Sequence, residues 1–296
     1  MADQSGRIAV VTGGGRGLGR AAAIGLASRG ATVVAVARNK GQLEETALIA
    51  AEAFAAHHVA GQATSLAATP GSGGRVIPIA ADVADIEAVE ALAARIERDH
   101  GTPTILVNAA GVFGPIALLH ETDPREWVDA VRVLAIAPYL TTHAFLPGML
   151  EAGWGRIVNV TSASSLHPPG PLTSAYGVGK TGLNRLTRHL AAEIAGTGVT
   201  ANVIHPGDVK TEMWADIRDQ LAGPRIGAAG DGLRGWVEWV GENGGDLPSK
   251  AVDLILRLTS DAGASINGRF CWIDDPLQPP IASWDDAPLD RPWAKD

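Results

Sequence analysis

Short apolar runs alternate with longer alanine-rich stretches along the first 210 residues. The runs are rich in Val and Ile, which favours strands, and the stretches between them favour helices. This alternation predicts βαβ units and therefore a parallel sheet. The predicted strands are residues 7–13, 31–37, 75–83, 104–111, 155–162 and 199–207, with a seventh at 268–274, and helices are predicted at 19–30, 41–56 and 86–99, among others.

Several of the predicted strands are apolar on both faces, as in residues 105–110 and 157–160. A strand of this kind is expected where helices cover both sides of the sheet. We therefore predict an α/β fold with a seven-stranded parallel sheet and helices on both faces. Because strands and helices keep alternating from the first strand to about residue 210, residues 1–296 are predicted to form a single domain.

Three segments interrupt the alternation. Residues 61–74 are small, polar and Gly-rich, and predict a flexible surface insertion. Residues 208–247 combine two helix-like stretches with a Gly-rich connection, and we interpret them as a mobile substrate flap. Residues 274–296 contain too many prolines for a regular element, and predict an extended C-terminal tail.

Charge and composition narrow the possible partners. The formal net charge is −8 and the basic residues are scattered, so no nucleic-acid partner is expected. The N-terminal residues lack a signal-peptide pattern and no apolar run is long enough for a membrane helix, so we expect a cytoplasmic protein without a membrane partner. Cys271 is the one cysteine, which excludes an internal disulfide. The eight histidines lack metal-ligand spacing, and no metal is expected.

A glycine-rich turn lies between the first predicted strand and helix. Gly13, Gly17 and Gly19 would permit a tight turn, a close approach of backbone N–H groups to a pyrophosphate, and close packing of the helix on the sheet. The alternative interpretation is a flexible loop. The strand before the turn and the helix after it favour dinucleotide binding.

The end of the second predicted strand bears on which nucleotide is bound. An acid there would accept hydrogen bonds from a ribose 2′-hydroxyl, but this chain has Ala37 at that position and Arg38 next. Arg16 lies in the glycine-rich turn, so two guanidinium groups could pair with a 2′-phosphate. This pattern favours NADP(H) over NAD(H). The alternative for Arg38 is a solvated charge at a strand end.

One of the two tyrosines, Tyr176, precedes Lys180 by four positions. On a helix the two side chains would share a face. A nearby ammonium favours the phenolate, which would bring the tyrosine toward a useful acid/base range. Such a pair also occurs by chance on helix surfaces. Ser162 favours the catalytic interpretation over a chance pair. It ends a predicted strand at the edge where parallel sheets bind ligands, and it could hydrogen-bond a substrate carbonyl.

Taken together these motifs resemble those of the short-chain dehydrogenase/reductase family. The resemblance covers residues 7 to about 211. It implies a Rossmann-type, doubly wound fold, NAD(P)-dependent chemistry on a carbonyl or alcohol, and a homodimer or homotetramer. The matching segments are residues 12–19, 82–83 and 108–111, Ser162, and residues 176–180 and 206–211, with a weaker match at 266–274.

The resemblance also implies residue roles. Tyr176 would be the acid/base, Lys180 would lower the tyrosine pKa and bind the nicotinamide ribose, and Ser162 would orient and polarise the substrate. These three residues form the expected catalytic set. The expected cofactor-binding set is Gly13, Gly15, Arg16, Gly17, Leu18, Gly19, Arg38, Asp82, Val83, Asn108, Ala109, Ala110, Gly111, Tyr176, Lys180, Pro206, Gly207, Val209 and Thr211.

The chain departs from the family pattern at Leu134. The family usually has an asparagine seven residues after the tryptophan that is Trp127 here, and that asparagine helps to hold a proton-relay water. We hypothesise that the main-chain carbonyl of residue 134 still holds the water. The C-terminal tail is a second departure from the family pattern. We consider two roles for it: a surface strap or subunit contact, or a cap over the pocket made by Trp284 or Trp293.

Two residues are candidates for substrate contact. His167 lies between Ser162 and Tyr176, and Trp214 lies in the predicted flap with Trp236 and Trp239. Aromatic residues there could close on an apolar substrate, or they could simply pack the flap.

We therefore predict an NADP(H)-dependent oxidoreductase that transfers hydride between the nicotinamide and a hydrophobic ketone or secondary alcohol. The alternative is a nucleotide-binding regulator or scaffold that has lost turnover, which is motivated by Leu134. A dehalogenase-like relative that no longer binds nucleotide is a third possibility, but such a protein would lack the glycine loop and the lysine.

Overall fold

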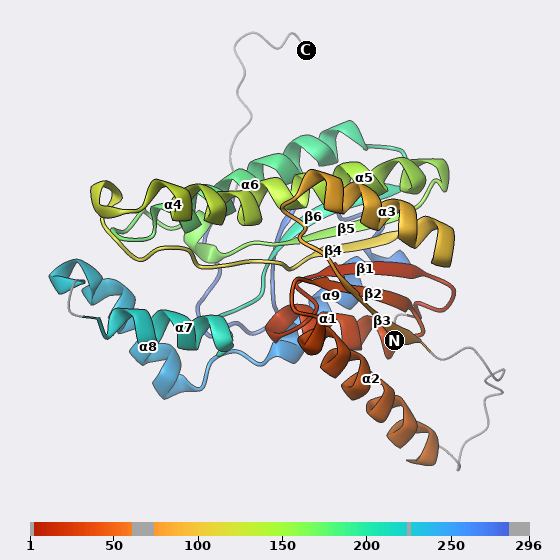
Figure 1. The fold of residues 1–296 in the computed structure, drawn as a ribbon, viewed down its shortest axis with the longest axis horizontal. Helices are drawn as coiled ribbons and strands as arrows, with labels where there is room; N and C mark the ends of the chain where they lie inside the picture. The colour runs from red at the N-terminus through yellow and green to blue at the C-terminus, as the bar shows by residue number, and fades with distance from the viewer. Residues whose placement is uncertain (1–2, 61–73, 224–225, 284–296) are drawn as a thin grey trace, which may run out of the picture.

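The described part of the chain folds around a seven-stranded parallel sheet (Figure 1). The computed structural model describes residues 3–60, 74–223 and 226–283. The strand order is β3-β2-β1-β4-β5-β6-β7, which confirms the predicted doubly wound arrangement. The strands are β1 (Ile8–Thr12), β2 (Thr32–Ala37), β3 (Arg75–Ala80), β4 (Ile105–Asn108), β5 (Gly155–Val160), β6 (Val199–His205) and β7 (Phe270–Trp272).

Successive strand residues point to opposite faces of the sheet, and both faces are buried. Val10 and Leu106 belong to the core on one face, whereas their neighbours Ala9 and Ile105 belong to the core on the other. All four are inaccessible to solvent. A strand that is buried on both sides needs apolar residues throughout, which explains why the sequence runs are continuous.

Two helical layers cover the sheet (Figure 1). The helices α3 (Ile86–His100), α5 (Ala137–Glu151) and α6 (Ser174–Glu193) cover one face, and α4 (Pro124–Val131) extends the α5 layer. The helices α1 (Gly17–Ala27), α2 (Lys40–Ala60) and α9 (Pro248–Leu258) cover the other face. The two halves of the sheet begin at β1 and β4, so a crevice is expected where their carboxyl ends diverge.

A π-helical turn, η2 (Arg132–Ile136), joins α4 to α5. By length and composition alone, the continuous stretch Pro124–Glu151 could cross a membrane, a test that core helices also pass. Here Ala137, Phe145 and Met149 belong to the core under the sheet, so the apolar composition is explained by packing.

The predicted flap contains α7 (Glu212–Leu221), a short 3-10 turn η4 (Gly227–Gly230), and α8 (Asp231–Asn243). These elements have their own apolar cluster, in which Trp214 and Val240 pack with Ile116 and Leu172 from the loops after β4 and β5. Its mobility stays a prediction.

Two other predicted segments are only partly described. Of the insertion at 61–74, all but Gly74 lies outside the described residues, and of the tail at 274–296, residues 284–296 lie outside, including Trp284 and Trp293. Residues 274–283 contain no helix or strand, as predicted for an extended tail. They are fixed at Asp246, whose carboxylate accepts from the Leu277 N–H at 3.1 and 3.2 Å.

Candidate active site

A cavity of about 580 Å³ lies at the carboxyl ends of the central strands. Its lining includes residues of the turn after β1, the ends of β2, β3 and β4, the segment from Val160 to Lys180, the flap after β6, and Gln278 of the tail. This is the position expected for a ligand in a doubly wound sheet, where the strand order reverses. The volume lies in the range of small-molecule and cofactor sites.

The glycine turn after β1 has no space for side chains at two of its positions. A Cβ on Gly19 would lie 2.2 Å from the carbonyl oxygen of Gly13. Gly13 has a φ of 68° and a Cβ there would lie 2.8 Å from the backbone of Ala109 and Ala110. Only glycine permits this approach of loop, helix and β4. The sequence interpretation of a tight turn, rather than a flexible loop, is therefore consistent with the geometry.

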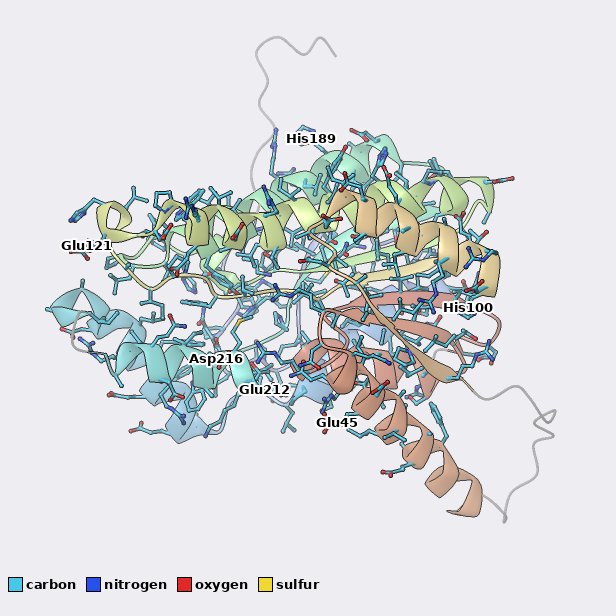
Figure 2. All side chains as sticks on the ribbon, in the orientation of Figure 1. Glu45, His100, Glu121, His189, Glu212 and Asp216 are labelled. Atoms are coloured by element: carbon cyan, nitrogen blue, oxygen red, sulfur yellow. The ribbon has the colours of Figure 1, made fainter. Side chains whose placement is uncertain are left out.

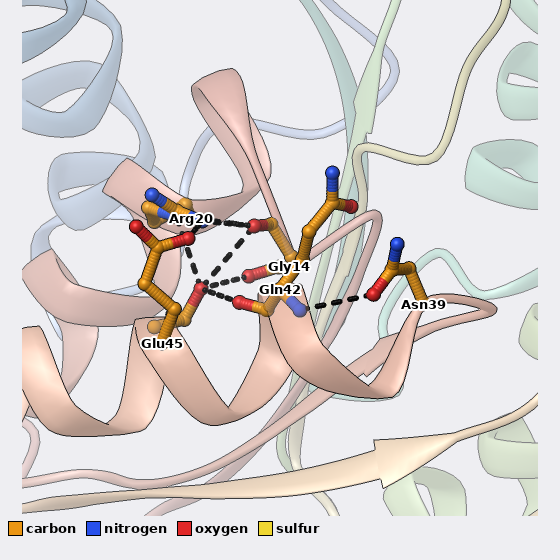
Figure 3. A network of polar contacts seen from close by, with 7 residues as sticks. Gly14, Arg20, Asn39, Gln42 and Glu45 are labelled. Atoms are coloured by element: carbon orange, nitrogen blue, oxygen red, sulfur yellow. Dashed lines mark hydrogen bonds and ion pairs between the residues drawn. The ribbon is translucent and has the colours of Figure 1, made fainter.

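Side chains of α1 and α2 hydrogen-bond to the backbone carbonyls of this turn (Figure 3). The Thr46 hydroxyl donates to the Gly14 carbonyl at 3.0 Å. Arg20 donates to the Gly15 carbonyl at 2.6 Å and pairs with Glu45 at 2.5 Å. Thr46 is inaccessible to solvent. The contacts of Thr46 with Gly14 and of Arg20 with Glu45 were not predicted from the sequence, because they join residues 32 and 25 positions apart.

The first turn of α1 is open to an anion. It has no side-chain cap at Arg16 and no acidic residue in its first turn, and Gly17, Leu18 and Gly19 line the cavity. The free N–H groups and the positive end of the helix dipole suit a pyrophosphate. These features fit a dinucleotide in this cavity.

The far end of the cavity from Tyr176, at the ends of β2 and β3, carries predicted cofactor-binding residues. Arg38 is exposed there next to Ala37, and Asp82 and Val83 line the same cavity. Asp82 Oδ1 accepts from the Ala84 N–H at 2.9 Å, which fixes the turn after β3.

Arg16 faces an acidic partner from the flap. Its guanidinium lies 3.6 Å from Asp216 of α7, an exposed ion pair. Figure 2 shows Glu212 and Asp216 on the side of α7 next to α1. Arg16 lines the cavity but does not contact Arg38 in this structure, so the predicted pairing of both guanidinium groups with one phosphate stays a prediction.

Ser162, Tyr176 and Lys180 meet at the other end of the cavity. Ser162 follows β5, and the other two lie on one face of α6, as their spacing predicts. Burial raises the pKa of Tyr176 to about 12, a hydrogen bond with the Ser162 hydroxyl lowers it, and the charge of Asp208 raises it. The Phe113 ring packs on the tyrosine with centroids 4.7 Å apart.

The expected lowering of the Tyr176 pKa is therefore not found in this structure. Burial outweighs the hydrogen bond from Ser162, and the same burial lowers the pKa of Lys180 to about 8. Lys180 is 5% exposed, its Nζ donates to the Val160 carbonyl at 2.7 Å, and it lies 5.7 Å from the tyrosine ring centroid. The sequence showed that the two residues share a face, but not how deeply they are buried.

Comparison with known proteins identifies the family. The family model for short chain dehydrogenases matches residues 7–222. The chain is 33% identical over 287 residues to short chain dehydrogenase mpl6 of Monascus purpureus, covering 97% of this chain and 84% of that protein. The chain belongs to the short-chain dehydrogenase family.

Two further similarities agree with this membership. The chain is 31% identical over 254 residues to the 3-oxoacyl-(acyl-carrier-protein) reductase FabG of Pseudomonas aeruginosa, covering 86% of this chain and 94% of that protein. A crystal structure of an actinorhodin polyketide ketoreductase variant with NADPH superposes with a TM-score of 0.77 at 26% identity, covering 92% of this chain and 97% of that one. The protein is thus an NAD(P)-dependent oxidoreductase with the Rossmann-type fold of this family.

All but one of the predicted site residues of this short-chain dehydrogenase line the cavity. The set includes His167 and Trp214, the two candidates for substrate contact. The lining residues are Gly13, Gly15, Arg16, Gly17, Leu18, Gly19, Arg38, Asp82, Val83, Ala109, Ala110, Gly111, Ser162, His167, Tyr176, Lys180, Pro206, Gly207, Val209, Thr211 and Trp214.

Asn108 is the exception. Its side chain is 3% exposed and does not line the cavity. Instead its amide donates to Asn159 Oδ1 at 2.9 Å, and its oxygen accepts from the Thr141 hydroxyl at 2.8 Å. Asn108 therefore ties β4 to β5 and α5 beneath the site. The family motif placed Asn108 correctly at the carboxyl end of β4 but did not show where its side chain goes.

Leu134 lies in the π-helical turn and is 1% exposed. Its side chain packs against Gly179 of α6 and approaches Gly111. The asparagine position of the family is thus filled here by an apolar contact. π-helical turns are frequent at functional sites, which agrees with the place of this turn beside Lys180.

Several cavity residues were not predicted. Asp208 lies within the predicted 206–211 segment although it was not singled out, His205 precedes that segment, Phe113 follows the 108–111 motif, and Gln278 comes from the tail. The Gln278 amide nitrogen lies 2.5 Å from His167 Nε2. Proximity to a motif could have indicated the first three, but nothing in the sequence pointed to Gln278. Among the described residues, no group of three or more His, Cys, Asp or Glu side chains is arranged to hold a metal.

Proposed function

We propose that this protein is an NADP(H)-dependent ketoreductase for hydrophobic ketones and the corresponding secondary alcohols. The observation that supports the proposal is the convergence of Ser162, Tyr176 and Lys180 on one cavity with the uncapped first turn of α1. When bound, the nicotinamide supplies or accepts the hydride.

The three residues have distinct tasks in this proposal. Ser162, already hydrogen-bonded to Tyr176, polarises the substrate carbonyl oxygen. Tyr176 gives a proton to that oxygen on reduction and takes it back on oxidation. Lys180 holds the nicotinamide ribose and, with the positive charge of the oxidised ring, favours the phenolate over the neutral phenol.

The preference for NADP(H) is supported by the residues at the end of β2. Ala37 offers no carboxylate to a ribose hydroxyl, and Arg38 is exposed at the cavity edge, where a 2′-phosphate would gain a charge-assisted contact. The neighbouring ketoreductase structure contains NADPH.

The apolar part of the cavity supports a hydrophobic substrate. Phe113, Met213, Trp214 and Trp236 line it, and the Phe113 ring packs on Tyr176. Trp214 is 7% exposed and packs in the flap cluster, so it forms a fixed wall. An apolar ketone would replace water on these surfaces.

We further propose a single-domain cytoplasmic protein that forms a homodimer or homotetramer. Val128, Ile136 and Tyr139 are each close to half exposed on the α4–α5 layer, at 47%, 46% and 48%. Exposed apolar side chains gathered on one layer support self-association. Light scattering coupled to size-exclusion chromatography tests the oligomer, and a monomer at micromolar concentration would contradict it.

The catalytic proposal is tested by following NADPH oxidation with a panel of cyclic and aryl ketones. We expect turnover that falls by at least about 1,000-fold in Tyr176→Phe, because the proton donor is lost. Thr122→Val, which changes a hydroxyl outside the cavity, serves as the control. If the protein binds nucleotide but turns over no ketone, and Tyr176→Phe behaves like the native protein, the alternative function is favoured instead. That alternative is a nucleotide-binding regulator that has lost turnover, which Leu134 motivates.

A further inference from the structure

The described part of the C-terminal tail reaches the cavity through Gln278. This residue is partly buried and lines the cavity, and its amide nitrogen lies 2.5 Å from His167 Nε2. His167 is exposed and lines the same cavity. Neither side chain is sealed inside the protein, so both keep surface for contact with a ligand.

The contact joins two segments that do not follow neighbouring strands. His167 comes after β5 and Gln278 comes after β7, and β6 lies between these strands in the sheet. The pair therefore spans the carboxyl end of β6, where Pro206 and Gly207 also line the cavity. The tail and the loop after β5 thus form one continuous part of the cavity wall.

The tail is fixed directly before Gln278. The Leu277 N–H donates to both carboxylate oxygens of Asp246, at 3.1 and 3.2 Å. Asp246 is 5% exposed, and the Lys250 ammonium lies 3.4 Å from it and 3.6 Å from the carboxylate of Asp275. Gln278 follows this anchor by one residue, so the fold sets where its side chain enters the cavity wall.

His167 is fixed by the turn that begins at the candidate catalytic serine. Ser162 caps the short 3-10 turn η3 (Ala163–Ser165), where its hydroxyl accepts from the Ser164 N–H at 3.2 Å. The His167 N–H donates to the Ala163 carbonyl at 3.1 Å. One compact segment therefore carries both the hydroxyl proposed to polarise the reacting carbonyl and the imidazole that meets the tail.

The pair has hydrogen-bonding capacity left for a ligand. Within the described chain, the contact with His167 is the one hydrogen bond of the Gln278 side chain. In either orientation of the amide, an N–H and an oxygen lone pair remain. The flap lines the same cavity with apolar residues, among them Met213, Trp214 and Trp236. This combination suits a ligand with an apolar body and one polar group besides the reacting carbonyl.

We propose that Gln278 is a specificity-determining residue which, together with His167, hydrogen-bonds a hydroxyl group on the part of the substrate remote from the reacting carbonyl. A hydroxyl both donates and accepts, which matches what the amide offers. The substrate class is then an apolar ketone with a second, remote hydroxyl group. The inference rests on the proposed function and narrows its substrate.

Three aryl ketones of increasing length test it, namely 4′-hydroxyacetophenone, 4-hydroxyphenylacetone and 4-(4-hydroxyphenyl)butan-2-one, each compared with its para-methyl counterpart. A series is used because the fold fixes the distance from the pair to the reacting carbonyl. Initial rates of NADPH oxidation give kcat and KM, and the thermal shift of the enzyme–NADP⁺ complex gives affinity without requiring turnover. At one length we expect the hydroxyl compound to exceed the methyl compound by about 5- to 100-fold in kcat/KM, as for one or two hydrogen bonds between neutral groups. The difference should lie mainly in KM, because a remote contact forms equally in the ground state and the transition state.

The decisive variant is Gln278→Leu, which keeps the approximate size and removes the donor and the acceptor. We expect it to reverse the preference, so that the methyl compound of the same length is favoured. His167→Leu should also weaken the preference, and the loss in the double variant should be smaller than the product of the two single losses, because the two groups act as a pair. Gln220→Leu removes an exposed amide on α7 outside the cavity and is the matched control, and circular dichroism checks folding.

Each outcome supports the role of Gln278 or overturns it. Equal kcat/KM and equal affinity within every hydroxyl–methyl pair overturn the proposal, as does a preference that survives in Gln278→Leu. An equal loss for both compounds in Gln278→Leu also overturns it, because the tail would then only shape the cavity. Absence of both NADP⁺ binding and turnover refutes the proposed function itself, whereas turnover without a preference refutes only the role of Gln278.

Discussion

Leu134 packs directly against Gly179, and a Cβ built on Gly179 would lie 2.6 Å from the Leu134 Cβ. The π-helical turn and α6 therefore approach each other as closely as a glycine allows, one residue before Lys180. This contact sets the position of the lysine relative to the turn. It replaces the polar contact that the family asparagine would make.

Gly179→Ala should destabilise the fold. The added methyl group meets Leu134 Cβ at 2.6 Å and Cδ1 at 2.9 Å, so either α6 or the π-helical turn must shift. We expect a loss of about 1–3 kcal/mol in the free energy of unfolding, measured by urea denaturation. Gly177 lies in the same helix, but a Cβ there would have no neighbouring atom within 4 Å. Gly177→Ala should therefore be neutral or stabilising by up to about 1 kcal/mol. Equal effects of the two substitutions would contradict the packing argument.

Leu134→Asn should cost stability without restoring activity. The amide would be buried beside Gly111 and Gly179, where the leucine is 1% exposed. We expect a loss of about 1–3 kcal/mol and a change in kcat of less than about tenfold, because the hypothesis assigns the relay water to the main-chain carbonyl. A rise in kcat of several orders of magnitude would show that the native protein has largely lost catalysis. Steady-state kinetics and urea denaturation give both quantities.

The stability of the protein without nucleotide should rise with pH because of Lys180. Burial lowers its pKa from 10.5 to about 8, so between these values the unfolded chain binds more protons than the folded one. The free energy of unfolding then increases across that window, by at most about 3 kcal/mol. Lys180→Met should remove the increase. Urea denaturation at about pH 8 and pH 10, compared between the native protein and Lys180→Met, isolates this group from the other titrating residues.

Tyr176 should act in the opposite direction at higher pH. Its folded pKa is raised from 10.0 to about 12, so the folded state retains its proton where the unfolded state loses it. Stability from this group is present below about pH 10 and is lost as the pH rises toward 12. Tyr176→Phe should remove that part of the decline. A decline of the same size in the variant would mean that the tyrosine is not buried as the structure has it.

The main features of the fold and the placement of the candidate catalytic residues could be predicted from sequence because they follow from local periodicity. Four positions on a helix bring Tyr176 and Lys180 to one face, and Ser162 follows a strand whose carboxyl end meets the same crevice. The direction of the Tyr176 pKa shift could not be predicted, since it depends on how deeply the folded chain buries the phenol, on which the Phe113 ring packs.

Contacts between residues that are far apart in the chain also could not be predicted from the sequence. Whether Asn108 lines the cavity depends on Asn159 and Thr141, which lie 51 and 33 positions away. Gln278 reaches His167 from 111 positions away, because the tail is fixed at Asp246. No motif or period connects such residues, so only the folded chain shows that they meet.

Arg38 should decide which nucleotide the protein prefers. It is exposed at the cavity edge beside Ala37, where no carboxylate is present to bind a ribose hydroxyl or to repel a phosphate. Arg38→Asp replaces a charge that attracts the 2′-phosphate by one that repels it and accepts from the 2′-hydroxyl. We expect kcat/KM for NADPH to fall by about 10- to 1,000-fold and that for NADH to rise, which reverses the preference. Arg95→Asp, on the exposed side of α3 and outside the cavity, should change neither value. If Arg38→Asp left the ratio unchanged, Arg38 would be a solvated strand-end charge, and Arg16 would have to carry the preference after release from Asp216.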